Sequence, residues 1–430
     1  MQAAKQGHTA LVVCSTAFVT LGRSQLNALG GADLPIAVMP HPFGVRTRAE
    51  VRALAETLVD EVARLALGGE DKTASKTYAR SKTDTRAATI TVLDDLNAFN
   101  DECEQRGWSD GLPLVPPTVA RVEAMLAATK RDGNEIVAHI APGFGAATVE
   151  RIAINAVMAG CRAEYLPVLL AAVEAVADEK FNLQGIQATT NSAAPWIIVN
   201  GPLAATLGIN AGLNCLGQGN RANATLGRAL RLVLQNIGGA LPGQMDRATH
   251  GQPGKYTFCC AENEAASPWQ PLHVARGFNA DDSVVTVVGA AGTLNLNSHS
   301  KDAADLLRAI ALSLVYPTSN DYHFAGAPWV ILSPEHAEVL QRGGLSKDDV
   351  KRGIWEQSKM EAGRFARKDF DRAKHTREKE LGGFTAETLV PIAPAPEDIG
   401  VIVAGGPGTH SVYVPTFGQT RAVSRQVKDE

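Results

Sequence analysis

The sequence predicts an α/β protein in which a small, incomplete Rossmann-like N-terminal half-domain is joined by a linker to a larger α/β domain. Short apolar runs typical of buried strands alternate along the chain with amphipathic helical patterns. Glycine and proline are plentiful, with 40 and 22 residues, whereas aromatic residues make up only 5%, which favours many tight connections. With 430 residues, 45% of them hydrophobic, the chain is long enough for two or three domains with real cores.

Residues 1–67 predict a β-α-β-α half-domain. Its second helix carries apolar residues at three- and four-residue spacing, and Gly30-Gly31 provides a stop signal for the first helix. Two strands and two helices are too few for an independent doubly wound sheet, so we expect an exposed edge that needs a partner. The predicted elements are strands over residues 9–14 and 35–39 and helices over residues 18–29 and 46–67.

Residues 68–88 are polar, rich in Thr, Ser and Lys, and without aliphatic periodicity, which predicts a flexible linker. Residues 89–430 form the predicted large domain, which would bind the substrate and carry catalysis. No internal repeat is visible in the sequence. The predicted helices of this domain cover residues 92–106, 119–128, 150–158, 166–177, 223–237, 303–314 and 347–379, and its clearest strands cover residues 196–199, 283–288, 329–332 and 399–403.

Charge and hydropathy exclude several classes of function. The 41 Lys and Arg residues against 45 Asp and Glu residues give a net charge of −4, so no global positive field favours nucleic acid or an anionic membrane. No apolar run approaches the ~18–20 residues that span a bilayer, and the first residues do not resemble a signal peptide. Six cysteines, none in C-x-x-C spacing, argue against a disulfide scaffold or structural zinc. We therefore expect a cytoplasmic protein in a reducing compartment.

The segment HGQPGKYTFCCAENE, residues 250–264, holds the densest group of reactive side chains. If its middle is extended, Cys259 and Cys260 point to opposite faces of the strand. Glu262 and Glu264 then share one side at the strand end, where paired carboxylates raise one pKa for acid–base catalysis. A surface loop with solvated charges would have the same composition, but two glycines and a proline stiffen this one. The catalytic candidates here are Glu262, Glu264, His250, Lys255 and Cys260, with Tyr256 as a substrate-binding candidate.

A second candidate site lies at the start of the predicted helix over residues 223–237, after the glycine-rich segment CLGQGN. Free N–H groups at a helix start favour an anion, and Arg221 could add a bidentate clamp on a carboxylate. Arg221 and Asn223 are therefore substrate-binding candidates, although ordinary capping by asparagine explains the pattern nearly as well. No G-x-G-x-x-G fingerprint follows a strand, so no nucleotide cofactor is expected, and the sequence indicates no other cofactor.

Four further candidates lie in turns or loops. Thr190 and Asn191 precede a clear predicted strand, where hydroxyls and amides either orient a ligand carbonyl or satisfy the turn backbone. Asp110 lies in the proline-pinned loop WSDGLP, where a turn-stabilising role competes with substrate binding. His410 follows the glycine-rich turn GGPG after the last predicted strand, a usual place for a backbone that approaches a ligand. No G-x-S-x-G elbow surrounds Ser411, which argues against a serine hydrolase triad.

The cysteines differ in their sequence surroundings. Cys14, Cys161 and Cys215 lie in apolar or small-residue segments, and we interpret them as packed rather than reactive. Of the adjacent pair Cys259 and Cys260, only one can face a pocket as a reactive thiol. The spacings H-x-H, H-x-x-x-H and H-E-x-x-H are absent, so no metal site is expected.

Two groups of segments resemble the UGSC-motif family, named for its selenocysteine- or cysteine-Gly-Ser-Cys loop. The segment TAFVTLGRSQLNALGGADLPIAVMPHPFG resembles the second half of that family's N-terminal domain. The segments WSDGLPLVPPT, INAVMAGCRAEYLPV, NCLGQGNRANATLGRA and HGQPGKYTFCCAENE are similar to the long domain beside it in some members. No CGSC occurs here, so the family's thiol residues are not carried over. The resemblance implies that a separate small subunit supplies the missing strands and the reactive thiol or selenol.

Together these features predict the large subunit of a small-molecule enzyme, either a lyase or a thiol-dependent reductase, that acts on a polar, carboxylate-bearing substrate. We expect the reactive side chains of residues 250–264 to form one pocket wall near Arg221 and the terminal glycine turn. Two alternatives stay open, namely a self-contained hydrolase or hydratase and a non-catalytic ligand-binding or scaffold subunit. The expected partners are the substrate and the separate small subunit, within an oligomer.

Overall fold

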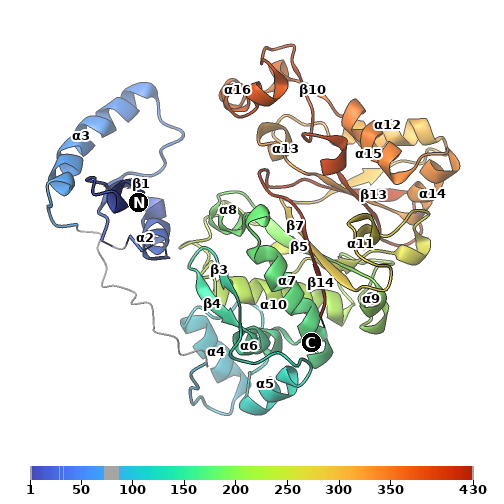
Figure 1. Ribbon diagram of the computed structural model, residues 1–430, viewed down its shortest axis with the longest axis horizontal. Coiled ribbons are helices and arrows are strands. Elements are labelled where there is room, and N and C mark those ends of the chain that lie inside the picture. The colour runs from blue at the N-terminus through green and yellow to red at the C-terminus, as the bar shows by residue number, and fades with distance from the viewer. Residues whose placement is uncertain (1, 29, 32, 72–86, 429–430) are drawn as a thin grey trace.

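The computed structural model, shown in Figure 1, describes residues 2–28, 30–31, 33–71 and 87–428. Helices alternate with strands that pair both in parallel and antiparallel, so the predicted α/β class is confirmed. Most of the predicted linker lies outside the described residues, and the domain boundaries stay a prediction. Within the described ranges, no helix combines the length and the apolarity needed to cross a membrane.

The N-terminal unit contains the four elements that the sequence predicts. Its two strands pair in parallel, and no further strand pairs with either of them among the described residues. The last helix begins with a capping box, in which Thr47 and Glu50 accept each other's main-chain N–H groups. Whether this pair belongs to a Rossmann-like sheet stays a prediction. The elements are α1 (Gln2–Lys5), β1 (Val12–Ser15), α2 (Val19–Ala28), β2 (Ile36–Met39) and α3 (Arg48–Ala66).

Two four-stranded mixed sheets form the centre of the large body. The first sheet consists, in spatial order, of β14 (Val423–Gln426), β7 (Val284–Ala290), β5 (Ala194–Asn200) and β6 (Cys259–Ala261). The second sheet consists of β8 (Leu294–Asn297), β13 (His410–Val414), β9 (Trp329–Leu332) and β12 (Gly400–Val403). Only β5 and β6 in the first sheet and β9 and β12 in the second sheet are parallel neighbours, and all other neighbouring strands are antiparallel.

The two sheets are copies of one strand pattern, although no internal repeat is visible in the sequence. Strands β14, β7, β5 and β6 correspond one by one to β8, β13, β9 and β12, with the same neighbours and directions. The equivalent strands β5 and β9 begin in the related segments APWIIVN and APWVILS. The outer strands are exchanged, because β8 follows β7 but pairs in the second sheet, whereas β14 follows β13 but pairs in the first.

The sheets pack face to face, and helices cover their outer faces (Figure 1). Alternate residues of β5, such as Trp196, point into the layer between the sheets, where Trp196 meets Trp329 edge to face at 5.8 Å between ring centroids. The intervening residues Ile197 and Val199 point outward into the helix-covered core. The outer helices include α6 (Val149–Ala159), α7 (Leu166–Ala177) and α10 (Arg221–Asn236) on the first sheet and α12 (Ala303–Ser313), α14 (Pro334–Arg342) and α15 (Lys347–Gln357) on the second.

The charged stretch 347–379, predicted as helix throughout, is divided in the structure. The helix α15 ends at Gln357, and a further helix begins only at Arg367. The sequence also gives no signal for the hairpin formed by residues 136–148. The other elements are α4 (Leu96–Gln105), α5 (Val119–Leu126), β3 (Ile136–Ile140), β4 (Gly145–Thr148), α8 (Leu183–Ala188), α9 (Pro202–Thr206), α11 (Leu272–Ala275), α13 (Asn320–His323), β10 (Met360–Glu361), α16 (Arg367–Leu381) and β11 (Leu389–Val390).

Candidate active site

Three polar side chains meet where the parallel strands β5 and β6 end, an edge of the sheet that commonly holds ligands. The amide nitrogen Nδ2 of Asn200 donates to Glu262 Oε2 at 2.6 Å and to Glu264 Oε1 at 2.9 Å. The Gly201 N–H donates to Glu264 Oε1 at 2.8 Å, and the Leu272 N–H donates to Glu262 Oε2 at 2.6 Å. The two carboxylates therefore share one amide group.

Glu262 also pairs with a lysine from the second half of the body. Lys347 is the first residue of α15, and its Nζ lies 3.5 Å from Glu262 Oε1 and 2.8 Å from the carbonyl oxygen of Gln270. The side chains of Lys347 and Glu262 are 8% and 0% exposed. Burial lowers the pKa of Lys347, and the Glu262 carboxylate opposes that shift. The two halves of the body are thus joined by a buried charge pair.

Glu264 faces a buried histidine. The Nε2–H of His273 donates to the carbonyl oxygen of Ala280 at 3.3 Å, which turns Nδ1 toward the carboxylate. That Nδ1 lies 3.7 Å from Glu264 Oε1 and has no hydrogen-bond partner among the described residues. The Glu264 side chain is 29% exposed, so a small molecule can reach it. Glu264 and His273 are therefore placed to move a proton to or from a ligand.

Two thiols meet in the layer between the sheets, close to these groups. Cys260 precedes Glu262 by two residues on the same face of β6, and its thiol hydrogen-bonds with the thiol of Cys215. This hydrogen bond lowers the pKa of Cys215, and nearby main-chain N–H groups of residues 215, 216 and 405 act in the same direction against the effect of burial. The same hydrogen bond and burial raise the pKa of Cys260. This thiol pair combines a thiol inclined to ionise with one that keeps its proton.

Asn223 anchors the loop of residues 211–219, which carries Cys215 and is mostly exposed. The Nδ2 of Asn223 donates to the carbonyl oxygens of Asn210 at 2.9 Å and of Cys215 at 3.0 Å. Its Oδ1 accepts the Asn210 N–H at 2.7 Å. Asn223 is 3% exposed, so it fixes the loop that carries Cys215 and does not present its amide to a ligand from solvent.

The glycine turn after β12 lies against both segments. The Asn263 N–H donates to the carbonyl oxygen of Val403 at 2.7 Å, and the Gly405 N–H donates to that of Ala211 at 2.8 Å. A Cβ atom on Gly406 would meet the exposed side chain of Leu213, which would have to move aside. Three segments, residues 209–220, 260–264 and 404–408, therefore meet in what we term the candidate active site.

The two thiols, the two carboxylates and Asn200 of this site all come from one of the two repeats. Strand register makes Cys260 equivalent to Ile402 and Glu262 equivalent to Ala404. The APW segments make Asn200 equivalent to Ser333. The N–H groups of Glu262 and Ala404 donate alike, to the carbonyl oxygens of the aligned strand-end residues of β5 and β9, at 3.2 and 3.0 Å. Because the second repeat builds the same strands without a thiol or carboxylate, the fold does not require them in the first.

The other reactive residues of segment 250–264 lie before β6, at the opposite end of the strand from Glu262. Lys255 Nζ binds both carboxylate oxygens of Asp246, at 2.8 and 2.6 Å. His250 is exposed, and Tyr256 is 52% exposed. The side chains expected to form one pocket wall are thus divided between the two ends of β6.

Thr190 and Asn191 lie beside the segment that leads to Lys255. The Thr249 N–H donates to the carbonyl oxygen of Thr190 at 3.0 Å. The Asn191 N–H donates to Thr189 Oγ1 at 3.0 Å, which is a turn-stabilising contact. Asn191 Oδ1 is buried without a partner among the described residues. These two residues therefore belong to the amino-terminal end of β5, away from the thiol pair.

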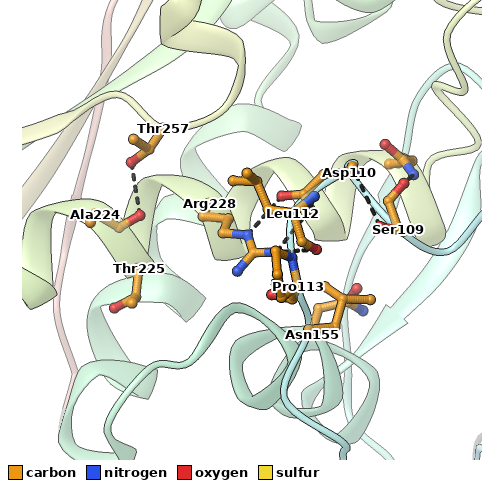
Figure 2. Close-up of polar contacts among 12 residues, drawn as sticks. Ser109, Asp110, Leu112, Pro113, Asn155, Ala224, Thr225, Arg228 and Thr257 are labelled. Carbon is orange, nitrogen blue, oxygen red and sulfur yellow. Dashed lines mark hydrogen bonds and ion pairs between the residues drawn. The ribbon is translucent and has the colours of Figure 1, made fainter. Parts of the chain in front are cut away.

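Arg221 and Asp110 are both engaged by groups of the protein. Arg221 donates through Nε and Nη2 to the carbonyl oxygen of Gly160 at 3.1 and 2.9 Å. Figure 2 shows that Asp110 receives a bidentate pair from Arg228 of α10, at 2.7 and 2.9 Å. Arg228 also donates to two carbonyl oxygens of the loop that carries Asp110. This ion pair fastens the loop WSDGLP to α10.

His410 begins β13 and is exposed, with its Nδ1 at 3.1 Å from Asn295 Nδ2. The neighbouring Ser411 is buried and lies 2.7 Å from Nδ1 of His336. The Nε2–H of His336 donates to the carbonyl oxygen of Ser298 at 2.9 Å, and burial lowers the pKa of His336. Both nitrogens of this imidazole are thus used inside the protein, which indicates a structural contact. In the part of the chain that the structure describes, no three His, Cys, Asp or Glu side chains are grouped to hold a metal ion.

Sequence reasoning missed Cys215, Lys347 and His273 as members of the site. Cys215 lies between glycine-rich turns, and that spacing was its only local signal. Lys347 reaches the site from α15, which is distant along the chain. His273 lies on α11, nine residues after Glu264, where no spacing rule marks it as a member of the site.

The fold and the site define an α/β protein with a buried thiol pair beside an acid–base group. Residues 1–68 match the model of the UGSC family, so the resemblance seen in the sequence is confirmed over this N-terminal part. The match ends before the candidate active site, whose chemistry therefore rests on its geometry. No curated protein matches the chain.

Proposed function

We propose that this chain is the large component of a small-molecule enzyme with thiol-dependent reductive chemistry, acting on a polar substrate at the candidate active site. The observation that carries the proposal is the contact between Cys215 and Cys260, two thiols of opposite pKa shift, in the layer between the two sheets. The depressed pKa favours the Cys215 thiolate as the nucleophile.

The reaction follows from the two thiols. The Cys215 thiolate attacks an electrophilic atom X of a substrate X–Y, so that an S–X bond forms and Y leaves with a proton. The Cys260 thiol then attacks the Cys215 sulfur, X leaves with the second proton, and a Cys215–Cys260 disulfide forms. The substrate gains two electrons and two protons, and the thiol pair loses them. An external thiol reductant restores the pair by thiol–disulfide exchange.

Three groups near the thiols support this role. Glu264 and His273 are placed to give the leaving group its proton, since one ring nitrogen of the histidine faces the carboxylate. Asn200 is 0% exposed, so it orients the two carboxylates and does not itself meet a ligand from solvent. Glu262 is fixed by Lys347, so we assign it to positioning Asn200.

A second polypeptide is part of the proposal. The parallel pair β1 and β2 leaves its outer edges unpaired among the described residues, and isolated strand pairs are marginal in water. We propose that a small, thiol- or selenol-bearing subunit adds strands there and reduces the disulfide. This chemistry needs reduced thiols, so we propose a cytoplasmic compartment.

The test is oxidation of the full chain with diamide, followed by mass mapping of the disulfide. We expect a Cys215–Cys260 disulfide that forms in the parent and in Cys259→Ser but not in Cys260→Ser. Cys259 is the matched control because it is adjacent in sequence and buried on the opposite side of β6. Equal behaviour of the Cys259 and Cys260 variants would remove the thiol pair from the mechanism.

The partner and the alternatives need a separate measurement. Native mass spectrometry of the chain expressed with its neighbouring open reading frames should retain a second, cysteine-rich polypeptide. An active preparation of this chain alone that resists thiol alkylation would favour a self-contained hydrolase or hydratase. A retained complex whose activity survives Cys215→Ser would favour a non-catalytic binding subunit.

A further inference from the structure

The helix α10 buries an arginine in an apolar stretch away from the thiol pair. Arg231 lies between Leu230 and Leu232 and is only 8% exposed. Its Nη1 donates to Gln187 Oε1 at 3.2 Å, whereas its Nη2 is buried with no hydrogen-bond partner among the described residues. Arginine is almost never buried without a partner, because an unpaired charge in the interior is costly. The Nη2 of Arg231 therefore lacks the hydrogen-bond acceptor that a buried guanidinium normally has.

Arg231 lines a small hollow that is partly open to solvent. Lys255, Gly227 and Gly254 also line it. A Cβ atom on Gly227 would collide with residues 257–258, so the glycine lets the chain before β6 lie directly against α10. The hollow is therefore a feature of the helix and of the segment that carries Lys255.

The hollow has surplus positive charge and surplus donors. Lys255 Nζ gives two of its three protons to Asp246, which leaves one. Two cations, Arg231 and Lys255, face one carboxylate, Asp246, so one positive charge stays uncompensated.

We propose that this hollow binds a singly charged oxyanion, the carboxylate group of a small molecule, through Nη2 of Arg231 and Nζ of Lys255. One negative charge matches the surplus, and a carboxylate supplies acceptors to both donors. Burial lowers the pKa of both side chains, and an anion in the hollow would act against that shift. The site is distinct from the thiol pair, because Lys255 and Glu262 lie at opposite ends of β6.

The test uses sodium acetate as the probe and the full chain. We expect a saturable rise in the melting temperature of the parent with acetate, and no equal rise with sodium chloride at matched ionic strength. Arg231→Gln should weaken acetate binding at least tenfold by calorimetry. Arg221→Gln is the matched control on the same helix, since Arg221 is exposed and bound to a carbonyl oxygen, and it should bind acetate as the parent does.

Every outcome decides the proposal. Absence of saturable acetate binding in the parent would overturn it, whatever the variants do. Equal loss in the Arg221 and Arg231 variants would also overturn it. If Arg231→Gln does not fold, Lys255→Met provides the second variant, and unchanged acetate affinity in it would reject the donor assignment. Cys215→Ser should bind acetate normally, which separates this site from the proposed thiol chemistry.

Discussion

The pair of Glu262 and Lys347 gives the sharpest test of how the two repeats are held together. Their side chains are 0% and 8% exposed, with 3.5 Å between carboxylate oxygen and Nζ. Removing one partner leaves the other as a buried, uncompensated charge, which costs about 3–5 kcal/mol. The loss of unfolding free energy for Glu262→Leu should lie at the upper end of this range, because Asn200 and Leu272 then also lose their hydrogen-bond acceptor. Lys347→Met should lie at the lower end.

The double variant separates a coupled pair from two independent losses. Replacing a buried ion pair by apolar residues is often neutral, so the double variant should lose less than the sum of the single losses, by about 2 kcal/mol or more. Urea unfolding followed by tryptophan fluorescence and far-UV circular dichroism measures these free energies, and coincidence of the two curves checks two-state behaviour.

An exposed ion pair on α14, in the same half of the body as Lys347, serves as the control. Arg342 and Glu338 are 74% and 54% exposed, so Arg342→Met should change the free energy of unfolding by less than about 1 kcal/mol. If the double variant loses as much unfolding free energy as the two single variants together, within about 0.5 kcal/mol, the coupling is contradicted. The lysine would then be a buried neighbour of the site and not the group that fixes its carboxylate.

Three further outcomes follow from the same contacts. Asn223→Ala removes the anchors of the Cys215 loop, so iodoacetamide should label Cys215 faster and the free energy of unfolding should fall by about 1–3 kcal/mol. Arg228→Met leaves Asp110 unpaired at 4% side-chain exposure and should cost about 3 kcal/mol in urea unfolding. Burial raises the pKa of Asp321 from 3.8 to about 6, so the folded state binds the extra proton between these values and its stability falls as the pH rises from about 4 to 6. This decline, roughly 2 kcal/mol between pH 4.5 and pH 7, should be missing from Asp321→Asn in urea unfolding at these two pH values.

Local sequence patterns predict those elements whose packing has one dominant period. The helix over residues 166–177 and the strand over residues 329–332 coincide with α7 and β9, because each is apolar and bounded by turn signals. The strands β8 and β14 give no such pattern, since each is a short outer strand that pairs with the other half of the body. The exchange of these strands depends on contacts far apart in the chain, which no local period can report.

The residues of the candidate site are likewise only partly predictable from local sequence patterns. Glu262 and Glu264 lie in a segment dense with reactive groups, and the structure brings both to Asn200. Cys215 follows a leucine and an asparagine in a small-residue loop, so its sequence surroundings indicate packing, and only the fold brings it to Cys260. The arginine on α10 that faces a hollow is Arg231, ten residues beyond the one at the helix start. Its signal, a charge inside the apolar run ALRLVL, is visible in the sequence but has meaning only once the helix is known to be buried.

The internal repeat provides an argument for function that does not depend on any relative. Two copies of one strand pattern face each other, and the second copy places Ile402 and Ala404 where the first places Cys260 and Glu262. Apolar residues are more favourable in such a layer, because burying a carboxylate costs desolvation free energy that only a partner such as Lys347 offsets. The first copy therefore keeps polar groups at positions where the second copy is apolar, and this difference supports the proposed chemistry. The lysine that pairs with Glu262 comes from the second copy, as the first residue of α15.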